Sequence, residues 1–95
     1  MPTHARTRQF DRDWRRLRTA ERDRYRVAFR KFDDDLTLGR FRPGLRVKGV
    51  QGAPGVFEMT FAPDGRATFE YGQSQSAGPH VIWRRVGSHA ILAAP

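Results

Sequence analysis

Arginine, histidine and glutamate side chains in the second half of the sequence suit chemistry on a phosphate ester. Histidine exchanges a proton near neutral pH, and both His80 and His89 lie in this half. A guanidinium stays charged and can bind two phosphate oxygens at once, which makes Arg66 a candidate for holding a phosphate. Glu58 is either a general base or only a cross-strand partner of a nearby cation. Together, these residue types could move protons and stabilise negative charge at a phosphodiester.

An excess of positive charge indicates a polyanionic partner. The 95 residues include 18 lysines and arginines, all but two of them arginine, against 10 aspartates and glutamates, so the net charge is +8. Such a field attracts nucleic acid, an acidic protein or an anionic membrane surface. No stretch is long and apolar enough for a membrane span, and residues 1–10 have no signal-peptide pattern. We therefore expect a cytoplasmic protein that binds nucleic acid or an acidic protein, without a membrane partner.

Composition limits the class of protein and of site. Hydrophobic residues make up 38% of the chain and include seven phenylalanines, which predicts one folded domain over residues 1–95. The absence of cysteine excludes disulfides and thiolate metal sites. The acidic run 33–35 does not change this, because adjacent carboxylates at the end of a helix do not converge on one ion. We expect neither a metal nor a cofactor.

The first half of the chain predicts one strand and two helices. Residues 3–10 are expected to form a short strand, and Asp11 is expected to cap the helix that follows. Thr19 offers a second cap, after which apolar residues recur at helical spacing over 20–37. Gly39 is a suitable end for this second helix. The two helices should form a hairpin with one apolar face.

The second half predicts antiparallel strands. Apolar and polar residues alternate over 45–48, 57–61 and 66–71, a last strand runs over 80–86, and a polar loop covers 72–79. Turn residues separate the strands at 52–55 and 63–65. The expected fold is α+β, with an N-terminal strand and a helical hairpin packed on one face of a mostly antiparallel sheet of four to five strands.

The other face of this sheet is expected to stay open and to carry the site. The charged side chains expected on this face either bind phosphate or pair with one another. The arginines of the two helices have similar alternatives: they could contact RNA or pair with neighbouring acidic residues. Arg66 could likewise be an ordinary solvated strand residue, and His89 a capping residue. The candidates on this face are Arg46, Lys48, Glu58, Arg66, Arg84 and His80, with His89 at its border.

Several segments together resemble the RelE/ParE toxin superfamily. FDRDWRRL at 10–17 resembles the opening of the first helix of these proteins, and PGLRVKGV at 43–50 resembles their second strand. GVFEMTF at 55–61 with DGRATFEY at 64–71 is similar to their central hairpin. HVIWRRVGSH at 80–89 is similar to their final strand and its closing Gly-x-His. The resemblance covers nearly the whole chain.

This resemblance implies the toxin of a type II toxin–antitoxin system, an endoribonuclease that cleaves mRNA at the ribosome and is inhibited by an acidic antitoxin. It places Arg66 at a phosphate-binding position and His89 at a catalytic one, with Arg46, Lys48 and Glu58 matched more loosely. The expected chemistry is metal-independent transesterification by the ribose 2′-hydroxyl. Relatives carry a catalytic Tyr or Phe in the C-terminal segment, whereas residues 91–95 are ILAAP, so the general base is unassigned.

Three alternatives stay open within or beside this resemblance. ParE-like members of the superfamily inhibit DNA gyrase and need no nuclease residues. A non-catalytic domain could use the same basic face only to bind nucleic acid. A degenerate toxin could have lost its activity.

Overall fold

A computed structural model describes residues 1–74 and 78–95. Its five strands form one sheet in the order β1-β5-β4-β3-β2, in which only the β1–β5 pair is parallel. The α+β prediction is confirmed, with the N-terminal strand as a fifth member of the sheet. Part of the expected polar loop, residues 75–77, lies outside the described residues. The elements, in chain order, are β1 (Thr3–Arg6), α1 (Arg8–Arg16), α2 (Thr19–Leu38), the 3-10 helix η1 (Pro43–Leu45), β2 (Lys48–Gly49), β3 (Phe57–Thr60), β4 (Gly65–Gly72), β5 (His80–Ser88) and the 3-10 helix η2 (His89–Ala93).

Helix caps set the bounds of the hairpin. Thr7 caps α1, because its side-chain oxygen accepts a hydrogen bond from the backbone N–H of Phe10 at 3.1 Å. The prediction that Asp11 is the cap is wrong: Asp11 lies inside the first turn and pairs with Arg6. The prediction for Gly39 is confirmed, since it ends α2 with φ of 84°, a left-handed conformation that suits glycine.

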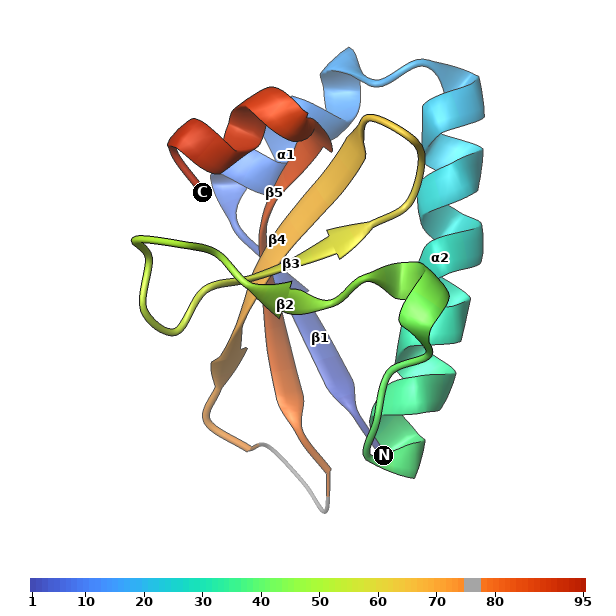
Figure 1. Ribbon diagram of the computed structural model, residues 1–95, viewed down its shortest axis with the longest axis vertical. Helices are drawn as coiled ribbons and strands as arrows, with labels where there is room; N and C mark the ends of the chain where they lie inside the picture. Colours follow the sequence, from blue (N-terminus) through green and yellow to red (C-terminus); the bar gives the residue numbers. More distant parts are fainter. Residues whose placement is uncertain (75–77) are drawn as a thin grey trace.

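The core lies between α2 and one face of the sheet (Figure 1). Phe32 of α2 is fully buried, and its ring centroid lies 4.9 Å from those of Phe69 in β4 and Trp83 in β5. Met59 of β3 is buried beside them. Burial of each of these side chains contributes roughly 1.5–3 kcal/mol, so this layer holds the sheet in place and fixes which strand residues face away from the helices.

The strand expected from Leu45 does not form. Pro43 opens the 3-10 turn η1, Leu45 is buried by it, and Arg46 takes a left-handed conformation with φ of 50°. Because proline fixes the backbone at the start of such a turn, local geometry overrides the apolar–polar alternation of this segment. Only Lys48 and Gly49 pair with β3.

The acidic run at the end of α2 supports tertiary contacts. His4 Nε2 lies 2.8 Å from Asp33 Oδ1, which joins β1 to α2. Asp35 accepts three hydrogen bonds of 2.8 Å from Arg42, one from its backbone N–H and two from its guanidinium. Asp33 and Asp35 therefore have different protein partners.

The Asp35–Arg42 pair predicts a pH-dependent contribution to stability. Hydrogen bonds from the side chain and backbone of Arg42 lower the pKa of Asp35 to about 2. A carboxyl group in an unfolded chain has a pKa of about 3.9, so the pair stabilises the fold fully above pH ~4 and loses its effect as the pH falls to ~2. In urea unfolding at several pH values, Asp35→Asn should flatten this part of the profile. An identical slope in wild type and variant would contradict the assignment.

Candidate phosphate-binding site

The sheet face turned away from α2 gathers several of the predicted site residues. Directly paired residues of antiparallel strands share a face, and Lys48 pairs with Glu58, which in turn pairs with Thr68. Arg66 lies two residues before Thr68 and pairs with Gly87 of β5. Lys48, Glu58 and Arg66 therefore lie on one face, opposite the buried row of Met59 and its neighbours.

Glu58 and Arg66 form a mostly buried ion pair. Arg66 Nε lies 3.9 Å from Glu58 Oε1, and the two side chains are 16% and 8% exposed. Charged side chains are retained at such low exposure when they are paired. Glu58 therefore lies where it can hold the guanidinium of Arg66, whereas little of its carboxylate is open to a ligand.

The turn between β3 and β4 positions Arg66. Its Nη1 lies within 3.3 Å of the backbone carbonyl oxygens of Ala62, Pro63 and Gly65, to which it donates. Gly65 allows this turn to close, because a Cβ atom there would lie 2.7 Å from the ring of Phe61. Within residues 1–74 and 78–95, Arg66 Nη2 makes no hydrogen bond, so one nitrogen of the fork remains available.

His89 is attached to the same turn. It is exposed, it opens η2, and its backbone N–H donates to Asp64 Oδ1 at 3.2 Å. The pairing of Ser88 with Gly65 places this end of β5 beside the start of β4. The structure thus brings His89 to the end of the sheet where Arg66 lies.

Two further predicted phosphate ligands are exposed, and two are held by protein contacts. Arg46 and Lys48 are both exposed. Arg84 donates to Glu70 and to the carbonyl oxygen of Pro95, each at 3.1 Å. His80 is 7% exposed and its Nδ1 lies 2.7 Å from the hydroxyl of Thr3, at the end of β5 far from Gly87. The expectation that His80 borders the same open surface as Arg66 is wrong.

The sheet face is also less open than expected. Pro95 lies against it, since its carbonyl oxygen accepts a hydrogen bond of 3.1 Å from the hydroxyl of Thr68, which is fully buried. Ile91 of η2 is buried and would contact any side chain added at Gly87. Apolar residues of η2 therefore cover the middle of this face, and the exposed part lies toward β2 and the β3–β4 turn.

A second buried ion pair, not expected from the sequence, fastens α1 to β5. Asp13 is 4% exposed and accepts two hydrogen bonds of 3.0 Å from the guanidinium of Arg85 and one of 3.2 Å from the backbone N–H of Val86. Burial alone would raise the pKa of Asp13, but hydrogen bonds from Arg85, Gln9 and Val86 outweigh it and lower that pKa. The buried carboxylate is therefore charged, and it holds β5 in register beside the helix.

The fold is that of the RelE and YafQ toxins. No protein-family model matches the chain, and no sequence among curated proteins matches it. Among the described residues, neither helix is long and apolar enough to cross a membrane.

Three solved structures illustrate the likeness. The chain is similar to the toxin in the DinJ–YafQ complex of E. coli, with a TM-score of 0.68, 13% identity and coverage of 97% of this chain and 98% of that one. It is similar to a chain of the RelB–RelE antitoxin–toxin complex of Methanococcus jannaschii, with a TM-score of 0.65, 13% identity and 94% coverage of both chains. For protein HP0894 of Helicobacter pylori the TM-score is 0.63, with 16% identity and coverage of 95% and 97%. At these identities the likeness concerns the fold.

Proposed function

We propose that this protein is the toxin of a type II toxin–antitoxin system and an endoribonuclease that cleaves mRNA at the ribosome. The observation that supports the nuclease most directly is that one turn, β3–β4, holds Arg66 and also receives the backbone N–H of the exposed His89. The exposed Arg46 and Lys48 extend the positive charge along this side of the sheet. The fold shared with RelE and YafQ supports the class of protein.

The proposed reaction uses the ribose 2′-hydroxyl as its own nucleophile. Its oxygen attacks the neighbouring phosphorus and its proton leaves to solvent water, while the bond from phosphorus to the 5′-oxygen breaks. Arg66 stabilises the extra negative charge on the phosphorane, and His89 gives a proton to the departing 5′-oxygen. The products are a 2′,3′-cyclic phosphate and a 5′-hydroxyl. Glu58 orients Arg66, because its carboxylate is buried against the guanidinium.

Replacement of His89 tests the proton-transfer step. Loss of a general acid lowers a rate typically by about 10²–10⁴, so His89→Ala should lower mRNA cleavage by this order. Primer extension on mRNA from a translating extract measures the rate, and Gln51→Ala, at an exposed position of the β2–β3 loop, is the matched control. His89 is exposed, so the melting temperature should stay within a few degrees of wild type. Full activity in His89→Ala would remove this residue from the mechanism.

The same proteins distinguish the rival functions. A ParE-like toxin would inhibit supercoiling by purified DNA gyrase, and this inhibition would survive His89→Ala. A domain that only binds nucleic acid would leave mRNA intact in every variant while still shifting labelled RNA. We expect cleavage without gyrase inhibition.

An acidic antitoxin is the proposed protein partner. The net charge of +8 favours such a partner through long-range attraction. The two comparison complexes were solved as RelB–RelE and DinJ–YafQ pairs. Co-purification of this protein with the product of an adjacent short acidic reading frame is the expected result.

A further inference from the structure

A groove along α2 takes no part in the proposed reaction. It has a volume of about 580 Å³, within the usual range of roughly 300–1,000 Å³ for sites that bind small molecules. One wall is α2, and the other is formed by η1 together with the end of β3 and the β3–β4 turn. Its apolar lining includes Val27, Leu45, Phe61 and Pro63. Val27 is 51% exposed, so part of this apolar surface faces solvent.

Two positive charges at this groove have no counterion. Arg24 and Lys31 line it, are exposed, and make no ion pair or side-chain hydrogen bond within residues 1–74 and 78–95. Residues three and four apart lie on the same side of a helix, so Arg24, Val27 and Lys31 form one stripe with the apolar residue between the cations. The carboxylate of Asp23, which also lines the groove, pairs with Arg26 at 3.0 Å. The groove therefore favours an anionic ligand with an apolar part.

The β3–β4 turn connects this groove to Arg66. Ala62 and Pro63 line the groove, and their carbonyl oxygens each accept a hydrogen bond of 3.3 Å from Arg66 Nη1. A phosphate bound at Arg66 and a group bound in the groove would therefore be separated by the backbone of one turn. A chain of linked phosphates can occupy both places at once, whereas a single small anion cannot.

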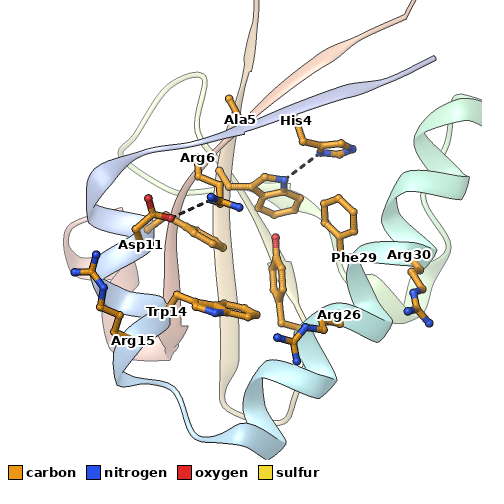
Figure 2. A pocket seen from close by; sticks show the side chains of 12 residues that line it. His4, Ala5, Arg6, Asp11, Trp14, Arg15, Arg26, Phe29 and Arg30 are labelled. Atoms are coloured by element: carbon orange, nitrogen blue, oxygen red, sulfur yellow. Dashed lines mark hydrogen bonds and ion pairs between the residues drawn. The ribbon is translucent and has the colours of Figure 1, made fainter.

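The opposite side of α2 has similar cations without the connection to Arg66. It forms one wall of the cleft between β1, α1 and α2 that Figure 2 shows. Arg15 and Arg30 line this cleft, are exposed, and make no ion pair in the part of the chain that the structure describes. The described residues that line the cleft include none from the β3–β4 turn. These two arginines therefore match Arg24 and Lys31 in charge and exposure but not in position.

We infer that the groove along α2 binds a nucleotide of the same RNA strand that lies at Arg66. The strand continues across the β3–β4 turn, and a base next to the cleaved bond packs against Val27 and Phe61. Seven residues of helix span about 10 Å, so Arg24 and Lys31 can bind phosphates on either side of this base. A purine has a larger apolar face than a pyrimidine, so the groove selects purines. The inference rests on the proposed function for the identity of the polymer and adds base selectivity to it.

The probe is a hexaadenylate in which every ribose carries a 2′-O-methyl group. No 2′-hydroxyl is then free to attack, so binding is measured without cleavage. NMR titration of the isotope-labelled protein should show saturable shifts of the Val27 methyl groups, the Phe61 ring and the Arg66 side chain. The corresponding hexauridylate should bind at least about threefold more weakly, because a pyrimidine covers less of the apolar lining.

Charge reversal tests the position of the strand. The double variant Arg24→Glu/Lys31→Glu should weaken binding of the hexaadenylate by at least about tenfold, because it places like charges opposite the phosphates. The matched control, Arg15→Glu/Arg30→Glu, makes the same change in net charge from +8 to +4, since each replacement subtracts two charges. Its positions are exposed and lie at the cleft of Figure 2. At about 0.15 M salt, which screens distant charges, this control should retain affinity within about threefold.

An uncharged replacement tests the base contact. Val27→Ala removes apolar surface without changing the charge, so the hexaadenylate and the hexauridylate should bind with nearly equal affinity. Leu38→Ala is the control, because Leu38 is an exposed apolar residue of the same helix that does not line the groove. This variant should keep the preference for adenine. Both positions are exposed, so the melting temperatures should stay within a few degrees of wild type.

Four outcomes would overturn the inference. The first is no saturable binding at millimolar oligonucleotide. The second is equal weakening in the two double variants, which would indicate attraction by net charge alone. The third is a shift of Arg66 without shifts of Val27 and Phe61, which would indicate that the strand does not enter the groove. The fourth is tighter binding of an acidic nine-residue peptide at the same residues, which would indicate a protein site.

Failure of the groove and failure of the nuclease are distinguishable. Cleavage of mRNA by a wild-type protein whose groove does not bind the hexaadenylate would reject the groove and leave the proposed function in place. Binding of the hexaadenylate in the groove by a wild-type protein that leaves mRNA intact would support the groove and reject the nuclease.

Discussion

Replacing Arg66 with alanine should lower the rate of RNA cleavage by about 10²–10³, the cost typical of losing one preorganised donor to a developing oxyanion. Arg66 is positioned on this face by Glu58 and by three carbonyl oxygens of the β3–β4 turn. Because the guanidinium is already in place, no free energy is spent on ordering it when the phosphorane forms. Single-turnover cleavage of a labelled mRNA in a translating extract measures the effect.

Two further variants separate charge from the structural role of Arg66. Arg66→Lys keeps the positive charge but loses the fork, so it should recover only part of the activity. Arg40→Ala removes an exposed arginine that follows α2 and should cleave at the wild-type rate. Thermal unfolding of all variants checks that the β3–β4 turn still folds. Wild-type cleavage by a folded Arg66→Ala protein would exclude the proposed mechanism.

Replacing Asp13 with alanine should lower the free energy of unfolding by about 3–5 kcal/mol, the usual cost of removing one partner from a buried ion pair. The change leaves the guanidinium of Arg85, which is 23% exposed, without its counterion. It also leaves the backbone N–H of Val86 without its acceptor in a buried position. Urea unfolding at neutral pH measures the loss.

An exposed ion pair that also involves a residue of α1 provides the control. Asp11 pairs with Arg6, and the two side chains are 45% and 66% exposed, so Asp11→Ala should cost at most about 1 kcal/mol. The double variant Asp13→Ala/Arg85→Ala should lose less unfolding free energy than the two single variants lose together, because it leaves no buried charge unpaired. Equal losses of unfolding free energy in Asp11→Ala and Asp13→Ala would show that burial of the ion pair does not set its contribution to stability.

Local sequence signals were sufficient for much of the fold. The apolar spacing over α2 and the glycine at its end predicted that helix closely, since both are local properties of the chain. The Asp64–Gly65 turn predicted the β3–β4 hairpin, and with it the position of Arg66 on the sheet face. The order of the predicted elements, with the helices before a series of antiparallel strands, led to the α+β class that the structure confirms.

The parts that sequence analysis missed depend on contacts between distant residues. A bulge opposite Thr68 and Phe69 shifts the register of β5 by one residue near Arg84, and such a shift moves side chains to the other face. His80 is buried because it meets Thr3, and this parallel pairing has no local signal. Likewise, the sequence ILAAP does not reveal that Pro95 accepts a hydrogen bond from Thr68. These contacts determine which of the predicted phosphate ligands stay exposed.

The pairing of β1 with β5 has a consequence for biosynthesis. Thr3 lies 77 residues before its partner His80, so β1 cannot pair until β5, the fifth strand along the chain, has been made. Contacts of such long sequence separation form late, after the local helices. His89 follows β5 directly and emerges later still. The sheet therefore closes only after β5 has been made, and the hydrogen bond that attaches His89 to the β3–β4 turn forms with it.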